Sequence, residues 1–272
     1  MLWQVTPANQ QGPPSYLFGT MHLLHESVMD WVFLATQTIE QCQAFATEFD
    51  FEEVDQLKLT EALSSSLPGP LSEQVSRQAW KNMQRYCKKH MGISAEVFQF
   101  QHPMLVQSAL SQLYRGHISG KAIDQILWEH AKINNIPCYG VESFDFQIEV
   151  IQKISYKAHI RNLNHFLKHF YAYHRKVTKL ITWYAQGELN KLYQAVKGDV
   201  GGSRRILAYD RNQQMAERFE ELAKGQSLFC AVGAGHLPGE KGMLRILKHR
   251  GFKLRPVGPD EFYKLEIPGH VD

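Results

Sequence analysis

The first fifty residues change their hydrophobic period in a way that predicts a strand, a helix and a second strand. Residues 15–24 begin as an apolar strand and reach a glycine that is followed at once by polar residues. Over residues 28–42, apolar side chains recur at helical spacing. Residues 44–50 form a second apolar run, with the carboxylate of Glu48 inside it. This order of elements favours a parallel α/β sheet.

The strand pattern returns after residue 136 and again near the C-terminal end. Residues 136–142 predict a third short strand that ends in Glu142, and residues 228–233 form a continuous apolar strand. A helix over residues 239–250 and a last strand over residues 252–257 follow. The sequence therefore predicts an α/β fold whose central, mainly parallel sheet is built from both ends of the chain.

Two long segments with helical spacing interrupt this sheet pattern. Pro68-Gly69-Pro70 is the clearest break in the chain, and helical periodicity dominates beyond it. We expect residues 71–133 and 147–205 to form large helical insertions that cap the sheet within a single domain of residues 1–272.

The composition is that of an ordinary globular protein. Thirty Lys and Arg residues and 27 Asp and Glu residues give a net charge of +3, so total charge predicts no nucleic-acid partner. No apolar run approaches the roughly 20 residues of a membrane-spanning helix, and the first residues lack the pattern of a signal peptide. We expect a cytoplasmic protein without a transmembrane segment in this chain, or a periplasmic or secreted one if a leader has been removed. Nothing in the sequence sets an oligomeric state.

One short motif occurs twice, and each copy contains a histidine that could bind a metal or act in catalysis. Gly19-Thr20-Met21-His22 and Gly233-Ala234-Gly235-His236 each place Gly-x-x-His directly after an apolar strand. Open α/β sheets bind ligands at such strand ends, and neutral imidazole is a common metal ligand. A single copy is most simply a hydrogen-bonded loop residue, whereas two copies in matching positions favour a shared site. The four scattered cysteines argue against a disulfide framework or a cysteine zinc site.

Two carboxylates and an amide are candidates for the same site. Burying Glu48 costs several kcal/mol unless the carboxylate meets a metal or a partner, although a strand-end side chain that points to water is the alternative. Glu142 ends a strand in the same way and Gln147 begins the next helix, so they either face the same cleft or cap the helix.

A predicted helix N-terminus contributes the last candidates. Asp210 and Gln213 have the form of a capping box, which places Arg211 and Asn212 in the first helical turn. This position suits the binding of an anion or of a developing oxyanion, and a surface arginine is the alternative. The chain has no P-loop, no Gly-x-Gly-x-x-Gly after a strand and no Gly-x-Ser-x-Gly, which disfavours NTPases, Rossmann dehydrogenases and serine hydrolases.

These segments together resemble one known family over nearly the whole chain. They are Leu2-Trp3, Tyr16-Leu17-Phe18-Gly19-Thr20-Met21-His22, Glu48, Gly140-Val141-Glu142 with Gln147, Arg211-Asn212 with Met215-Ala216, and Ala231-Val232-Gly233-Ala234-Gly235-His236-Leu237-Pro238-Gly239. The sequence resembles the TraB/PrgY/GumN family, which includes the TIKI proteases. The resemblance implies a fold related to the erythromycin esterase and ChaN-like group, and, in the TIKI branch, metal-dependent peptide cleavage at two Gly-x-x-His motifs and an acidic residue.

The leading hypothesis is a metal-dependent hydrolase, and specifically a metallopeptidase, that acts on a peptide or small-molecule substrate. We expect a divalent metal (Mn, Co or Zn) to be held by His22, Glu48 and His236. The expected catalytic residues are Glu48, Glu142 and Arg211, with one glutamate as a metal ligand and the other as the general base. The expected substrate contacts are Gln147, Asn212, Gly19, Gly233 and Gly235. Two alternatives are a metal-independent, esterase-like hydrolase with a histidine base, and a protein that binds a peptide or small ligand without cleaving it.

Overall fold

The computed structural model describes residues 1–7, 13–64, 68–111, 121–197 and 208–259. The chain forms two compact units, which differ in their secondary structure. The first, called the sheet unit here, comprises Met1–Val54, Ile118–Gln147 and Leu180–Asp272. The second, the helical unit, comprises Asp55–His117 and Ile148–Lys179. The predicted α/β class is confirmed.

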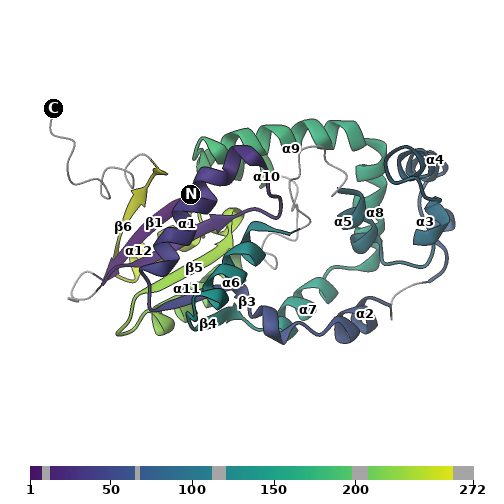
Figure 1. Ribbon diagram of the computed structural model, residues 1–272. Helices are drawn as coiled ribbons and strands as arrows, with labels where there is room; N and C mark the ends of the chain where they lie inside the picture. Colours follow the sequence, from purple (N-terminus) through teal and green to yellow (C-terminus); the bar gives the residue numbers. More distant parts are fainter. Residues whose placement is uncertain (8–12, 65–67, 112–120, 198–207, 260–272) are drawn as a thin grey trace, which may run out of the picture. The chain divides into compact units, whose positions relative to one another are not determined.

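A six-stranded sheet forms the centre of the sheet unit, in the order β4-β3-β5-β2-β1-β6 (Figure 1). The strands are β1 (Leu2–Pro7), β2 (Ser15–Thr20), β3 (Ala44–Phe49), β4 (Cys138–Glu142), β5 (Leu228–Gly233) and β6 (Phe252–Val257). Strand β2 pairs in parallel with β5, and β3 pairs in parallel with β4 and β5. Strand β1 pairs antiparallel with both β2 and β6. The sheet is therefore mostly parallel and is built from both ends of the chain, as the sequence predicts.

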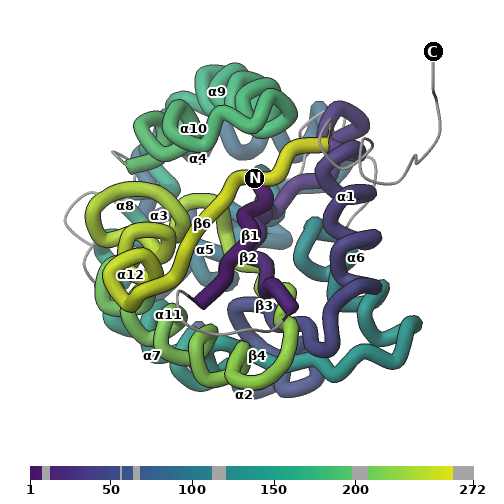
Figure 2. The backbone as a smooth tube through the Cα atoms, turned by 90° about the vertical axis from the view of Figure 1, so that its left-hand side faces the viewer, coloured from purple at the N-terminus to yellow at the C-terminus, as the bar shows by residue number. Residues whose placement is uncertain are grey.

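Helices cover both faces of this sheet. Figure 2 shows α1 (Met29–Glu40) and α6 (Ile123–Ile133) on one side of the strands, and α11 (Asp210–Leu222) and α12 (Met243–His249) on the other. The central strand β5 is consequently buried on both faces, which explains its unbroken apolar sequence. The ring of Phe229 in β5 lies 5.9 Å from Phe18 and 6.0 Å from Phe45, so the aromatic side chains of three neighbouring strands pack together.

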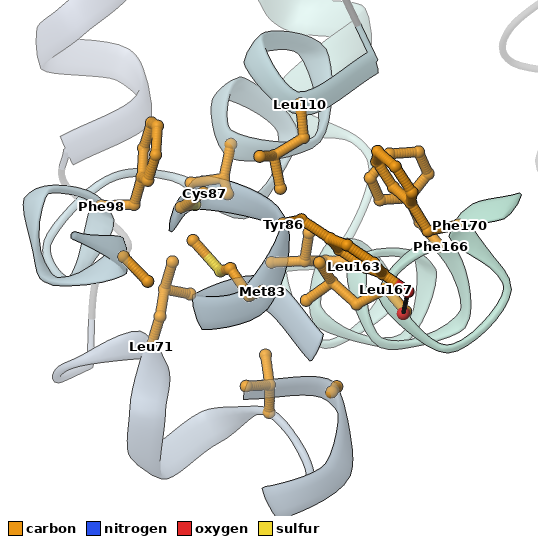
Figure 3. Close-up of a cluster of buried hydrophobic side chains, with 14 residues drawn as sticks. Leu71, Met83, Tyr86, Cys87, Phe98, Leu110, Leu163, Phe166, Leu167 and Phe170 are labelled. Carbon is orange, nitrogen blue, oxygen red and sulfur yellow. Dashed lines mark hydrogen bonds between the residues drawn. The ribbon is translucent and has the colours of Figure 1, made fainter. Parts of the chain in front are cut away.

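The helical unit has its own apolar core. Its helices are α2 (Gln56–Ser64), α3 (Leu71–Gln74), α4 (Arg77–Tyr86), α5 (Pro103–Ser111) and α8 (Tyr156–Lys168). Figure 3 shows Met83 and Tyr86 of α4 in this core together with Leu163 and Phe166 of α8. The ring of Tyr86 stacks on Phe170 at 4.0 Å. A core of this kind holds α4 in a fixed orientation, because its inner face is completely buried.

Three more helices complete the described chain. Helices α7 (Phe144–Gln152) and α9 (Phe170–Ala185) contain points at which the sequence passes between the two units, and α10 (Leu189–Val196) belongs to the sheet unit. Across the described ranges, no helix combines the length and the apolar character that crossing a membrane requires.

The start of α11 differs from the sequence prediction. The expected capping box is wrong, because Asp210 is already helical and the preceding residue, Tyr209, has helical dihedral angles of −70° and −48°. The side chain of Tyr209 makes no capping hydrogen bond. Arg211 and Asn212 nevertheless lie in the first turn, as predicted, so the error concerns the capping and leaves their place in the fold unchanged.

Candidate active site

The residues selected from the sequence meet at one edge of the sheet. Strand β2 ends two residues before His22, and β5 ends at Gly233, three residues before His236. Strand β3 carries Glu48 and β4 ends at Glu142. Because these four strands are parallel, their carboxyl ends lie at the same edge, where α/β sheets commonly bind ligands.

A buried arginine joins the two glutamates. Arg211 Nε donates to Glu142 Oε1 at 2.9 Å, and Arg211 Nη2 donates to Glu142 Oε2 at 2.6 Å and to Glu48 Oε2 at 2.9 Å. Gln147 Nε2 donates to Glu142 Oε2 at 2.6 Å. The surface-arginine alternative is therefore wrong, because Arg211 is buried between the carboxylates. The Glu142 side chain is only 1% exposed and that of Glu48 is 17% exposed, so Glu48 is the carboxylate within reach of a ligand.

The surroundings give the two carboxylates different acidities. Burial alone would raise the pKa of Glu48, but His236, Arg211 and the Gly233 N–H outweigh it and lower this pKa to about 2. Glu48 is consequently ionised at neutral pH. Burial raises the pKa of Glu142, and the hydrogen bonds and charge of Arg211 oppose that rise. The two groups share one guanidinium cation, which leaves the trio with a net negative charge when both are ionised.

Asn212 fixes the tautomer of His236. Asn212 Nδ2 donates to the carbonyl oxygen of Lys241 at 2.7 Å, so Asn212 Oδ1 is the atom that faces His236 Nδ1, at 2.6 Å. An amide oxygen only accepts hydrogen bonds, which assigns a proton to Nδ1. Burial lowers the pKa of His236, against the opposing effect of Glu48, so the ring is neutral at pH 7. The lone pair of Nε2 then lies 3.7 Å from Glu48 Oε1.

His22 has a related neighbour but a different exposure. Its side chain is 80% exposed, and its Nδ1 lies 3.9 Å from Oδ2 of Asp124, which is the second residue of α6. The other carboxylate oxygen, Asp124 Oδ1, is buried without a hydrogen-bond partner among the described residues. Burial raises the pKa of Asp124, and His22 opposes this rise. Each Gly-x-x-His histidine thus has a side-chain oxygen near its Nδ1, but only His236 is held by it.

Glu48 and His236 are the predicted metal ligands that the structure brings together. In the described ranges, no group of three His, Cys, Asp or Glu side chains is close enough to hold a metal ion. The chemistry of the pair still fits a divalent metal, because an imidazole Nε2 and a carboxylate oxygen face each other with their lone pairs available. The participation of His22 as a third ligand stays a prediction.

Two of the three predicted glycines are needed for close approach. A Cβ atom at Gly19 would lie 2.9 Å from Leu237 Cδ1, and one at Gly233 would lie 3.0 Å from Glu48 Oε1. The Gly233 N–H also donates to Glu48 Oε1 at 2.7 Å. By contrast, a Cβ at Gly235 would meet nothing within 4 Å. The first glycine of each motif is therefore the one that the geometry requires.

Comparison with known proteins identifies the family of the chain. The family model of the TraB/PrgY/gumN family matches residues 1–256. The chain belongs to the TraB/PrgY/gumN family. It is also similar to the protein named metalloprotease TIKI2 from Danio rerio, at 22% identity over an alignment of 313 positions. The alignment covers 92% of this chain and 59% of that relative. The chain thus spans about three fifths of the length of the relative. No solved structure matches it significantly.

Two residues of the candidate site were not selected from the sequence. The first is Asp124, because its relation to His22 depends on the packing of α6 against the sheet. Tyr184 is fully buried, and its hydroxyl donates to the Gly19 carbonyl oxygen at 2.6 Å, across 165 residues of sequence. A buried tyrosine in a helical apolar pattern gives no signal of such a partner.

Proposed function

We propose that this chain is a metal-dependent hydrolase of peptides, with Glu48, His236 and His22 at its reaction centre. The observation that carries the proposal is the 3.7 Å approach of His236 Nε2 to Glu48 Oε1. Both atoms are electron-pair donors, because Asn212 keeps the proton on the other nitrogen of the ring. Two donor atoms side by side in a buried site favour a cation between them.

The residues that would hold the metal are His236, Glu48 and His22. Nitrogen and carboxylate oxygen ligands suit Mn, Co or Zn. When bound, a divalent metal lowers the pKa of a water molecule and polarises a carbonyl group. The name of the Danio rerio relative, a metalloprotease, supports this reaction class.

The other residues of the site position these groups. Glu142 is the less exposed carboxylate and accepts three hydrogen bonds from Arg211 within 3.1 Å, so we assign it the role of holding Arg211 and not that of general base. Arg211 in turn holds Glu48 and keeps it ionised. Asn212 orients His236, and Asp124 is placed to orient His22, in the manner of the carboxylate and carbonyl groups that often support metal-binding histidines.

A second candidate is a metal-independent hydrolase, and one observation favours it. In the part of the chain that the structure describes, no three potential metal ligands converge. His236 is neutral and oriented by Asn212, so its Nε2 can take a proton from a water molecule that attacks a carbonyl group. Glu48 would then stabilise the imidazolium that forms, through charge at 3.7 Å.

The test compares metal content and peptide cleavage in the purified chain of 272 residues. The variants are His236→Ala, Glu48→Gln and His22→Ala, and the matched control is His165→Ala, because His165 is an exposed histidine on α8. Bound metal is measured by mass spectrometry and by titration with Mn, Co or Zn. Turnover is measured with a mixed peptide library, with and without a chelator.

The two candidates predict different results. The metal-dependent hydrolase predicts about one bound metal per chain and chelator-sensitive cleavage, with both lost in the three site variants and retained in His165→Ala. Chelator-resistant cleavage that still requires His236 would favour the metal-independent mechanism. A stable complex with uncleaved peptide would favour a binding protein.

A further inference from the structure

The small net charge of the chain hides a strong separation of charge between the two units. The helical unit contains 14 Lys and Arg residues and only five Asp and Glu residues. The rest of the chain contains 16 and 22, respectively. The helical unit is therefore strongly basic, although the whole chain is close to neutral. A charge asymmetry of this size is typical of proteins that bind an anionic surface.

Four of these 14 basic residues lie along one face of α4 and the turn that follows it. The basic stripe, as we call it, consists of Arg77, Lys81, Arg85 and Lys88, all exposed and spaced by four, four and three residues. This spacing places the four side chains on one side of a helix. The opposite side of α4, which includes Met83, is buried in the core of the helical unit (Figure 3).

The stripe residues differ from several basic residues of the sheet unit in having no counter-ion among the described residues. None of the four forms an ion pair with any described residue. In the sheet unit, by contrast, Lys121, Lys132, Lys191 and Arg218 each pair with a glutamate at 2.7–3.0 Å. Exposed cations that lie in a row without counter-ions produce a local positive potential.

Exposed apolar side chains lie in a segment that follows the stripe and contacts α4. Val97 belongs to the 3-10 turn Ala95–Phe98 and is 54% exposed. Phe100 follows this turn and is 72% exposed. This turn packs beside α4, because Gln84 Nε2 donates to Glu96 Oε1 at 3.3 Å. Gln84 lies between Lys81 and Arg85 in the sequence and, three residues after Lys81, on the same side of the helix. The turn also brings one acidic group, Glu96, to the patch.

We propose that the basic stripe and the adjacent Val97 and Phe100 form a docking surface for an anionic lipid bilayer. The combination is what identifies the partner. Lysine and arginine attract the negative headgroups, while an exposed phenylalanine and valine gain free energy by entering the boundary between headgroups and acyl chains. A face that is simply solvated needs no exposed phenylalanine, and recognition of a nucleic-acid backbone gains little from an exposed valine.

The test measures the binding of the full chain to lipid vesicles by cosedimentation. Vesicles of phosphatidylcholine alone are compared with vesicles that also contain phosphatidylserine, at low and at high salt. The stripe variant carries four substitutions: Arg77→Gln, Lys81→Gln, Arg85→Gln and Lys88→Gln. The control variant removes the same charge from the sheet unit: Lys121→Gln, Lys132→Gln, Lys191→Gln and Arg218→Gln. A third variant, Val97→Ser with Phe100→Ser, removes the apolar contacts, and circular dichroism checks the folding of each protein.

We expect binding to the anionic vesicles only, and weaker binding at high salt. Since each basic residue near such a surface contributes about fivefold to the partition coefficient, the stripe variant should bind at least about a hundredfold more weakly. The control variant should keep most of the binding, and the variant without the apolar side chains should lose part of it.

Three results would overturn the proposal. One is the absence of binding to anionic vesicles by the unmodified chain. Another is an equal loss of binding in the control variant, which would show that net charge and not the stripe is responsible. The third is stripe-dependent binding to a short single-stranded RNA without binding to vesicles, which would identify a nucleic-acid surface instead.

Discussion

Replacing Arg211 by methionine tests whether the candidate site is held together by buried charge. Methionine has a similar length but no charge and no hydrogen-bond donor. In the Arg211→Met variant, Glu142 loses three hydrogen bonds of 2.6–3.1 Å and Glu48 loses one of 2.9 Å. Breaking a buried ion pair by removing one partner costs about 3–5 kcal/mol, because the other charge stays buried. We expect a loss of this size in the free energy of unfolding at neutral or higher pH.

The loss should depend on pH in a defined direction. Without Arg211, the hydrogen bond from Gln147 still opposes the effect of burial on Glu142, but the larger opposing effect is gone, so the pKa of Glu142 in the folded variant rises further above the value in the unfolded chain. The folded variant then binds a proton that the unfolded chain has released. Its stability must fall by up to about 1.4 kcal/mol per pH unit as the pH rises from the unfolded pKa to the folded one. The destabilisation should therefore be small near pH 5 and several kcal/mol near pH 8.

Urea unfolding followed by far-UV circular dichroism, at these two pH values, measures the effect. A second variant, Arg211→Met with Glu142→Gln, removes the charge that is left behind. It should recover part of the lost stability at the higher pH and little at the lower. The reasoning is refuted if Arg211→Met is equally destabilised at both pH values, or if Glu142→Gln restores nothing in that background.

Three further changes have defined outcomes. Asn212→Leu removes the acceptor of the His236 Nδ1–H, so the 15N NMR shifts of the ring should show a mixture of tautomers and the rate of catalysis should fall. An unchanged ring spectrum would show that Asn212 does not set the tautomer. Tyr184→Phe leaves the buried carbonyl oxygen of Gly19 without its donor and should lower the free energy of unfolding by about 1–3 kcal/mol in urea titrations; an unchanged value would contradict this. Burial and a neighbouring histidine lower the pKa of His102 from 6.5 to about 4, so the unfolded chain takes up a proton first as the pH falls. As the pH falls between these two values, the free energy of unfolding should decrease by up to about 1.4 kcal/mol per pH unit. In the His102→Phe variant, the free energy of unfolding should depend less on pH in this range.

The sheet could be predicted from the sequence to a large extent, because its central strands are buried on both faces. Strand β5 has the predicted bounds, and β2 and β3 lie within their predicted segments. Strand β1 was missed, because Gln4, Thr6 and Pro7 interrupt the apolar pattern of its sequence, Leu-Trp-Gln-Val-Thr-Pro. It becomes a strand through its two antiparallel neighbours, β2 and β6, and the latter comes from the other end of the chain.

The members of the site could also be found from the sequence, but their contacts could not. Arg211 lies 163 residues from Glu48 and 69 from Glu142, and no local pattern indicates that one guanidinium contacts both carboxylates. The sequence therefore left open which glutamate is accessible. The basic surface of the helical unit was missed for a different reason. Total charge averages over two units of opposite sign, and only the fold shows which residues belong to each.

The two Gly-x-x-His motifs are equal in sequence but not in structure, and the difference bears on how the site binds a ligand. After β5, the 3-10 turn Ala234–His236 brings the ring of His236 back to Glu48, and Asn212 fixes it there. The side chain of His22 is exposed, and its nearest carboxylate, Asp124, lies at 3.9 Å. A group that is already ordered loses no further rotamer entropy on binding, whereas ordering an exposed side chain opposes binding. His236 and Glu48 are therefore the ordered part of the proposed site, whereas the binding of a ligand that contacts His22 would also have to order this exposed side chain.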